Sequence, residues 1–263
     1  MNNKFINVNS LNNSFVSFKG ATPFDHCVVD NFLEPNFASL VENEFINFDS
    51  DSWFTYSNAL EDKKTLNDWN IFPYNNYLLF SYLTSEKFVT YLSKLYGKKL
   101  YPDPGLHGGG WHIHDSSGNL NPHLDYSIHP KLKLQRVINL IIFISKELKP
   151  EHGGYLGLWS HDQCSNQPLD LITEVEPRFN RAIFFDTTQN SWHGMSKKLL
   201  LPQGIYRKSL AVYYLCDTTD DTNKRGKALY APRVDQRNDP GIRELINMRA
   251  GIDTSKLVYR KKS

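Results

Sequence analysis

Residues 136–144 read Arg-Val-Ile-Asn-Leu-Ile-Ile-Phe-Ile, a nearly continuous apolar run. β-branched and aromatic side chains favour strands, and a strand that is apolar at almost every position must be covered on both faces. Asn139 is the one polar side chain inside the run. We therefore expect a buried central strand, with helices supplying its outer cover.

Four further stretches have strand-like composition and are separated by turn residues: 111–114, 155–159, 181–185 and 209–215. A series of short strands of this kind is typical of an antiparallel sandwich or a jelly roll. The predicted fold class is therefore mainly β with flanking helices.

Three helices are also predicted. Helix-spaced apolar residues follow Pro35, which suits a first helical turn, and a second apolar face lies between the capping Thr84-Ser85 and Gly97. These two helices are expected to support the sheet. A third helix is expected from about Pro240 to Ala250, ended by Gly251.

The chain divides into three parts. Residues 1–22 form an N-terminal extension rich in Asn and Ser, expected to be frayed or a short edge strand with little to bury. Residues 23–216 form one core domain, and residues 217–263 form a less regular C-terminal appendage.

Charge and composition exclude several classes of protein. The 263 residues include 30 basic and 28 acidic ones, a balance that argues against nucleic acid as a partner. The basic residues near the end, Lys224-Arg225, Lys227 and Arg260-Lys261-Lys262, are interpreted as a solvated tail. No run approaches the roughly 20 apolar residues of a membrane span, and the N-terminus lacks a signal-peptide pattern. A soluble, cytoplasmic protein is expected, with Cys27, Cys164 and Cys216 as reduced thiols.

The chemistry is indicated by Pro122-His123-Leu124-Asp125 and, far downstream, by His193. A strand places residues i and i+2 on one face, so His123 and Asp125 can point at one ion. His193 follows the strand-like stretch 180–186 and can arrive from a neighbouring strand. Two histidines and one carboxylate on one side of iron(II) leave positions open for a bidentate cosubstrate and dioxygen.

A candidate cosubstrate anchor lies further along the chain. Arg207 and Ser209 open the apolar strand 209–215 and share one of its faces. A guanidinium group can donate two charge-assisted hydrogen bonds to one carboxylate, and the Ser209 hydroxyl can add a third. The pair therefore suits the distal carboxylate of a dicarboxylic acid.

The order of these motifs resembles the prolyl-hydroxylase-like branch of the Fe(II)/2-oxoglutarate oxygenase superfamily, especially its bacterial and phage members. The resemblance covers residues 23–216 and is carried by Gly108-Gly109-Gly110-Trp111-His112, His123-x-Asp125, Gly153–Trp159, Asn180–Phe185, His193 and Arg207-x-Ser209. It implies a double-stranded β-helix of jelly-roll type. It also implies iron(II) on His123, Asp125 and His193, 2-oxoglutarate on Arg207, dioxygen as co-reactant, and ascorbate as a possible reductant.

Two positions refine this transfer. Asp125 stands where halogenating relatives carry a small residue, so hydroxylation is favoured over chlorination. Prolyl hydroxylases often carry a Tyr that touches the distal carboxylate, at a position matched here by Phe143. His112 or Asn139 is the candidate replacement for that contact, with a structural role for either as the alternative.

His114, His129, His152 and His161 are interpreted as surface or substrate-rim residues. The first expectation for the substrate is a prolyl residue of a protein or peptide. The alternative with the same chemistry is a small molecule, such as a free amino acid or a sugar-linked intermediate. A non-catalytic jelly-roll binding module and a cupin-like zinc hydrolase are the rivals from other classes.

Overall fold

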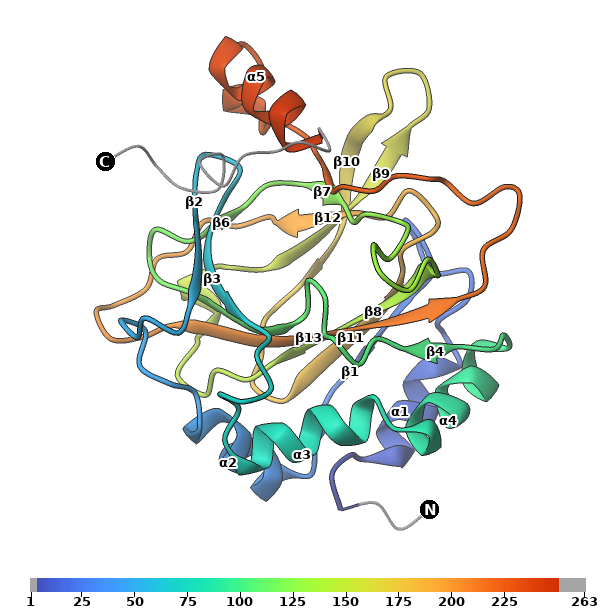
Figure 1. The fold of residues 1–263 in the computed structure, drawn as a ribbon. Coiled ribbons are helices and arrows are strands. Elements are labelled where there is room, and N and C mark those ends of the chain that lie inside the picture. The colour runs from blue at the N-terminus through green and yellow to red at the C-terminus, as the bar shows by residue number, and fades with distance from the viewer. Residues whose placement is uncertain (1–3, 251–263) are drawn as a thin grey trace.

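Two curled antiparallel sheets build the core of the computed structural model, which describes residues 4–250 (Figure 1). The nine-stranded sheet contains β1 (His26–Val29), β2 (Phe54–Ser57), β3 (Glu61–Leu66), β4 (Tyr101–Pro102), β5 (Gly110–His114), β6 (Asn119–Leu120), β8 (Gln135–Phe143), β11 (Arg181–Asp186) and β13 (Arg207–Cys216). The five-stranded sheet contains β7 (His123–Leu124), β9 (Leu156–Asp162), β10 (Gln167–Val175), β12 (Trp192–Met195) and β14 (Leu229–Tyr230). The predicted fold class, mainly β with a jelly-roll core, is confirmed.

The central strand of the larger sheet is β8, flanked by β11 and β13. Its side chains alternate between two environments. Ile138, Leu140 and Ile142 belong to the core cluster that the helices cover, whereas Asn139 and Ile141 line a cavity between the sheets. The expectation of a strand buried on both faces is confirmed, and Asn139 is the polar group that this alternation turns inward.

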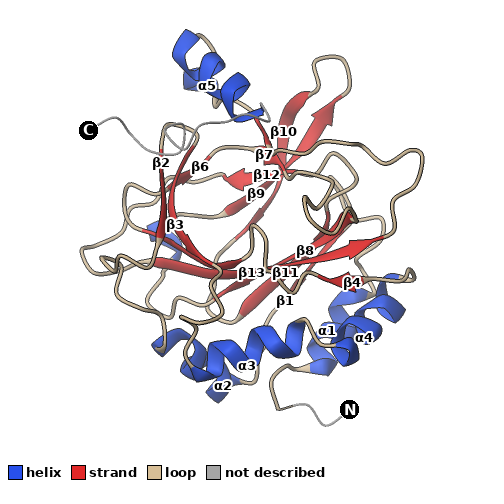
Figure 2. Ribbon diagram, in the orientation of Figure 1, coloured by secondary structure: helices blue, strands red, loops and turns tan. Residues whose placement is uncertain are grey.

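Four helices lie together on one side of the larger sheet, opposite the smaller one (Figure 2). They are α1 (Val8–Phe15), α2 (Pro35–Asn43), α3 (Tyr74–Leu83) and α4 (Glu86–Tyr96). The predicted caps of α4 are confirmed: the Ser85 hydroxyl accepts a hydrogen bond from the Phe88 N–H, and Gly97 ends the helix at a φ of 83°. Pro35 occupies the first turn of α2, as predicted.

The N-terminal extension was expected to bury little, and this prediction is wrong. Asn7 caps α1 through its side chain, and Leu11 and Phe15 are buried. Phe15 stacks on Phe18 at a centroid distance of 4.7 Å and meets Phe184 of β11 edge-on. Scattered Phe and Leu residues thus complete the core beneath the larger sheet.

The segment after β13 returns to the smaller sheet, where β14 pairs with β7. The predicted helix is confirmed as α5 (Pro240–Ala250), and its Ile242 packs with Tyr230 and Leu60. Gly251 and the basic end of the chain lie outside the described residues. Within residues 4–250, no helix combines the length and apolar character that a bilayer span requires.

Candidate active site

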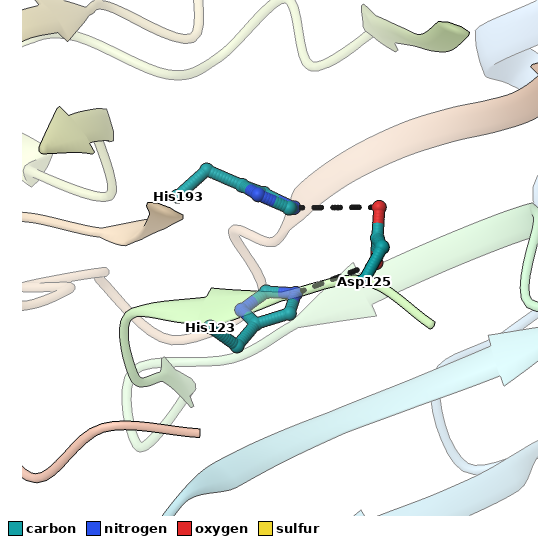
Figure 3. Close-up of side chains that lie close together, drawn as sticks. All are labelled: His123, Asp125 and His193. Atoms are coloured by element: carbon teal, nitrogen blue, oxygen red, sulfur yellow. Dashed lines mark ion pairs between the residues drawn. The ribbon is translucent and has the colours of Figure 1, made fainter. Parts of the chain in front are cut away.

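Three side chains from the smaller sheet converge on one point (Figure 3). His123 lies on β7, Asp125 follows directly after it, and His193 is the partner of His123 in the β12–β7 pairing. The Nε2 atoms of His123 and His193 each lie 3.8 Å from an oxygen of Asp125. One potential ligand atom from each residue falls within 4.8 Å of the other two, so the structure brings the three predicted residues together.

Backbone carbonyls orient both imidazoles. The Nδ1 atom of His123 lies 3.0 Å from the carbonyl oxygen of Asn121, and that of His193 lies 2.9 Å from the carbonyl oxygen of Ser191. A carbonyl oxygen can only accept, so Nδ1 of each ring carries a hydrogen, and in the neutral imidazole the lone pair is then on Nε2. Both lone pairs are thus available at the point where the Asp125 carboxylate also arrives.

The charge states suit a cation at this point. Burial, assisted by the neighbouring His193, lowers the pKa of His123 to about 3, so its imidazole is neutral near pH 7. Burial would raise the pKa of Asp125, but His193, His123 and Arg136 outweigh it and lower this pKa to about 2. The cluster therefore offers a neutral nitrogen and an ionised carboxylate without a proton to displace.

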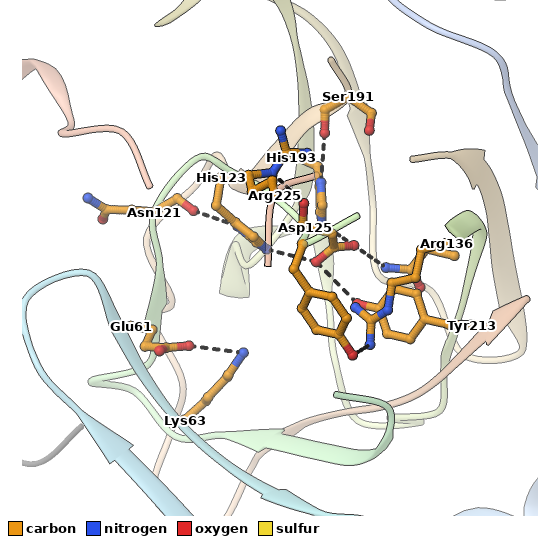
Figure 4. Close-up of polar contacts among 12 residues, drawn as sticks. Glu61, Lys63, Asn121, His123, Asp125, Arg136, Ser191, His193, Tyr213 and Arg225 are labelled. Carbon is orange, nitrogen blue, oxygen red and sulfur yellow. Dashed lines mark hydrogen bonds and ion pairs between the residues drawn. The ribbon is translucent and has the colours of Figure 1, made fainter. Parts of the chain in front are cut away.

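Asp125 is held by groups from three other segments (Figure 4). The Asn139 amide donates to its Oδ2 at 3.2 Å, and the Tyr213 hydroxyl donates to its Oδ1 at 3.3 Å. The Nε of Arg225 donates to the backbone oxygen of Asp125 at 2.8 Å. Asn139 and Tyr213 are paired across β8 and β13, which explains why both reach the same carboxylate.

Arg207 is buried on the cavity-facing side of β13, with 6% of its surface exposed. Its Nε donates to the carbonyl oxygen of Gly154 at 2.8 Å. Within residues 4–250 no carboxylate forms an ion pair with it, and burial lowers its pKa to about 10. A buried, charged guanidinium without an acidic partner is costly, and an anionic ligand would offset that cost.

The neighbouring Gly154 makes room for Arg207. Its φ is 67°, and a Cβ there would lie 2.9 Å from Cδ of Arg207 and 2.5 Å from a methyl carbon of Leu199. Glycine is therefore needed both for the backbone conformation and for the close approach of the arginine. Gly154 thus permits a tight turn of the chain ahead of β9.

One cavity of about 1350 Å³ contains both groups. It is lined by the His123, Asp125 and His193 cluster and by Arg207, Ser209, His112 and Asn139, together with His114. In the antiparallel pairing of β13 and β5, Arg207 lies opposite His114 and Ser209 lies opposite His112. The structure therefore brings every predicted site residue to one cavity.

The roles of the predicted contacts differ within that cavity. The amide of Asn139 is engaged by Asp125, so this residue supports the carboxylate. Phe143 occupies the position matched to the Tyr of prolyl hydroxylases, and the centroid of its ring lies 5.1 Å from the guanidinium carbon of Arg207. The Nε2 of His112 and both ring nitrogens of His114 are buried without a hydrogen-bond partner among the described residues. Polar atoms in that condition mark a place where a ligand can bind.

The interpretation of the remaining histidines needs correction. His114, His129 and His152 are buried, whereas they were expected at the surface or the substrate rim. Only His114 of these three lines the cavity. The Nε2 of His129 instead lies 3.4 Å from Oδ1 of Asp103, and both side chains are buried. Isolated histidines in polar stretches carry no sequence signal for burial, because burial depends on how distant strands pair.

Sequence reasoning missed the contribution of the C-terminal segment. The interpretation of Arg225 as part of a solvated tail is wrong, because its side chain donates to the backbone oxygen of Asp125. The Tyr230 ring stacks on the His123 ring at a centroid distance of 5.1 Å and an angle of 22°. The Nε of Arg233 donates to the side-chain oxygen of Asn121, and the backbone carbonyl of the same Asn121 orients His123. No motif or periodicity marks these residues, although the strand-like pair Leu229-Tyr230 was a weak signal for β14.

Residues 109–215 match the family described as the 2OG-Fe(II) oxygenase superfamily. Among curated proteins, no sequence matches the chain. Several solved structures are similar in fold. A prolyl-4-hydroxylase from Pseudomonas putida is 14% identical with a TM-score of 0.49, covering 78% of this chain and 99% of that one.

Two further structures illustrate the range of these similarities. The collagen prolyl hydroxylase of Paramecium bursaria Chlorella virus-1, solved with 2-oxoglutarate, is 12% identical with a TM-score of 0.48, covering 76% of this chain and 98% of that one. HygX from Streptomyces hygroscopicus, solved with nickel, 2-oxoglutarate and hygromycin B, is 12% identical with a TM-score of 0.47, covering 73% and 82%.

The stretch matched by the family contains the three converging side chains, Arg207 and Ser209. Members of that superfamily use iron(II), 2-oxoglutarate and dioxygen, and the cavity offers a two-histidine, one-carboxylate cluster beside a buried guanidinium. The chain is therefore similar to the 2OG-Fe(II) oxygenase superfamily over residues 109–215, the stretch that contains the converging side chains.

Proposed function

We propose that this chain is a 2-oxoglutarate-dependent dioxygenase that hydroxylates an unactivated C–H bond, with iron(II) held by His123, Asp125 and His193 and with 2-oxoglutarate anchored by Arg207. The observation that carries the proposal is the convergence of two Nε2 atoms and one carboxylate oxygen within 4.8 Å of one another. Two imidazoles and a carboxylate on one side of a metal form the donor set of non-haem iron(II) oxygenases.

The cosubstrate assignment rests on charge and reach. 2-Oxoglutarate is a dicarboxylate, and Arg207 is a buried cation without a carboxylate partner within residues 4–250. Ser209 is buried two residues along the same face of β13 and can donate its hydroxyl. The unpartnered nitrogens of His112 and His114 lie on the opposing strand and supply further donors in place of the missing Tyr.

The metal and cosubstrate, when bound, supply the oxidising chemistry: 2-oxoglutarate, dioxygen and a C–H substrate become succinate, carbon dioxide and an alcohol. The protein's part is orientation and exclusion of water. Asn121 and Ser191 fix the two imidazoles, and Asn139 and Tyr213 fix the two oxygens of Asp125. Burial of all three ligands keeps bulk water from them.

The first candidate substrate is a prolyl residue of a protein or peptide, supported by the resemblance in motif order to prolyl hydroxylases. The alternative is a small molecule, such as a free amino acid or a sugar-linked intermediate. A cavity of about 1350 Å³ exceeds what 2-oxoglutarate needs and has room for either beside the cosubstrate.

The proposal is tested by anaerobic titration of the protein with iron(II) and 2-oxoglutarate. We expect a weak visible charge-transfer band, and on admission of oxygen a slow formation of succinate that ascorbate increases and zinc inhibits. His123→Ala and Asp125→Ala should lose both signals while the far-ultraviolet circular dichroism is retained.

His26→Gln is the matched control, because His26 lies on β1 outside the cavity. Succinate formation that survives His123→Ala and Asp125→Ala would remove the ligand assignment. Hydrolysis activated by zinc would favour the zinc-hydrolase rival. If the protein binds 2-oxoglutarate but shows no metal-dependent turnover, the result would favour a non-catalytic binding module.

A further inference from the structure

A second arginine lines the same cavity at a distance from the cosubstrate anchor. Arg136 lies on β8 and is 1% exposed. It is paired with Leu215 near the end of β13, whereas Arg207 begins that strand. Tyr213 lies between them on the cavity side, and its hydroxyl reaches Asp125. The two guanidinium groups therefore flank the His123, Asp125 and His193 cluster.

Two aromatic rings hold the Arg136 guanidinium in one plane. Its central carbon lies 3.5 Å from the centroid of the Tyr126 ring and 3.5 Å from that of Tyr213. One terminal nitrogen also donates to the Tyr126 hydroxyl and to the His107 carbonyl oxygen. A cation sandwiched in this way is fixed in position, and its free edge is the direction left for a ligand.

No carboxylate within residues 4–250 forms an ion pair with Arg136, and its Nε is buried without a hydrogen-bond partner. Arg136 lowers the pKa of Asp125, but in the proposed holoenzyme the charge of Asp125 serves the metal. A Cβ at Gly108 would lie 2.9 Å from a terminal nitrogen of Arg136, so a glycine leaves room for this side chain. Arg136 is thus a buried cation that is held in a fixed position and has no carboxylate partner among the described residues.

The cavity around it is also positively charged. Seven Lys or Arg side chains and three acidic side chains line the cavity. Of the three acids, Glu61 is paired with Lys63 and Arg249, and Asp125 belongs to the His123, Asp125 and His193 cluster. Lys133, Lys224 and Lys227 add positive charge without an ion pair to a described carboxylate. Such a field attracts negatively charged ligands and speeds their association.

We propose that Arg136 is a substrate-binding residue that receives an oxyanion of the substrate, a carboxylate or a phosphate, across the metal cluster from Arg207. This inference rests on the proposed function and narrows its substrate class: the molecule hydroxylated carries a negative charge near the reacting carbon. Lys133, Lys224 and Lys227 guide that charge into the cavity.

The experiment uses the full chain loaded with manganese(II), which is paramagnetic, and with saturating 2-oxoglutarate. Inorganic phosphate is titrated while its ³¹P relaxation is measured, and acetate is titrated in a second arm through its methyl protons. We expect saturable relaxation of at least one anion, which distinguishes phosphate from carboxylate. Arg136→Met should weaken that anion's affinity by about tenfold or more, as for loss of a charge-assisted hydrogen bond.

Arg178→Met is the matched control, since Arg178 is exposed and lies outside the cavity. If Arg136→Met does not fold, Arg136→Lys and the exchange of Lys133, Lys224 and Lys227 for Gln give the same readout, each expected to weaken the anion. Equal affinity in wild type and Arg136 variants, or no relaxation of either anion with manganese(II) and 2-oxoglutarate bound, overturns the inference. Failure of manganese(II) to bind instead counts against the proposed metal site.

Discussion

At the scale of single residues, the cavity is lined by buried polar groups that lack ion-pair or hydrogen-bond partners among the described residues. Arg207 and Arg136 are buried cations without ion pairs to described carboxylates, and His112 and His114 hold unpartnered ring nitrogens. Burying such groups costs free energy that packing alone does not return. Their concentration in one cavity therefore points to ligands that complete them.

Replacing Arg207 by Met should weaken 2-oxoglutarate binding by about 2 to 5 kcal/mol, the range for truncating one partner of a buried charge pair. Arg207→Lys should recover only part of that loss, because an ammonium group keeps the charge but not the planar fork. The measurement is calorimetric titration of the manganese(II)-loaded protein. A dissociation constant for 2-oxoglutarate that Arg207→Met leaves unchanged would place the anchor on another residue.

At the scale of elements, local signals explain most of the helices and strands. Ser85 and Gly97 bound α4 as their residue types predict, and β8 alternates between core and cavity because its side chains have a period of two. The helices α1 and α3 and the strands β2, β3 and β10 were not predicted. In α1 the polar composition conceals a buried face. Leu11 is fully buried in that face, whereas Val16 is 86% exposed directly after the helix.

Leu11→Ala should lower the free energy of unfolding by about 2 to 5 kcal/mol, because it deletes buried methyl groups and leaves a cavity. Val16→Ala is the control and should change it by less than about 0.5 kcal/mol. Urea denaturation followed by circular dichroism gives both values. Similar small effects of the two substitutions would mean that α1 does not contribute to the core.

At the scale of the whole molecule, the C-terminal segment closes over the strand that bears His123. β14 pairs with β7, Tyr230 stacks on His123, and Arg249 of α5 forms a buried ion pair with Glu61 of β3. The segment thus ties the smaller sheet to the larger one beside the cavity. Residues beyond the matched stretch 109–215 therefore help to build the site.

Arg249→Met should destabilise the protein by about 3 to 5 kcal/mol, because it leaves Glu61 buried without one of its two basic partners. Burial would raise the pKa of Glu61, but Lys63 and Arg249 outweigh it and lower this pKa below the ordinary 4.5. Its stabilising effect is therefore present above pH 4.5 and lost as the pH falls through the lower folded-state pKa.

Unfolding free energies of wild type and Arg249→Met should accordingly converge as the pH is lowered below that range. Arg243→Met is the control, since Arg243 lies on the exposed side of the same helix. A Glu61→Gln, Arg249→Met double variant should recover part of the loss near neutral pH, because the buried charge is removed. A pH-independent difference would assign the effect to packing.

The sequence by itself indicated the strands β5, β8, β9, β11 and β13, the caps of α4 and the candidate ligands His123, Asp125 and His193, because local composition and short motifs mark them. Tertiary structure alone decided that α1 is core, that His114 lines the cavity, and that Tyr230 and Arg136 stand beside the cluster. The physical reason is that these contacts join side chains far apart in the chain, and their free energy arises only when the strands pair and exclude water.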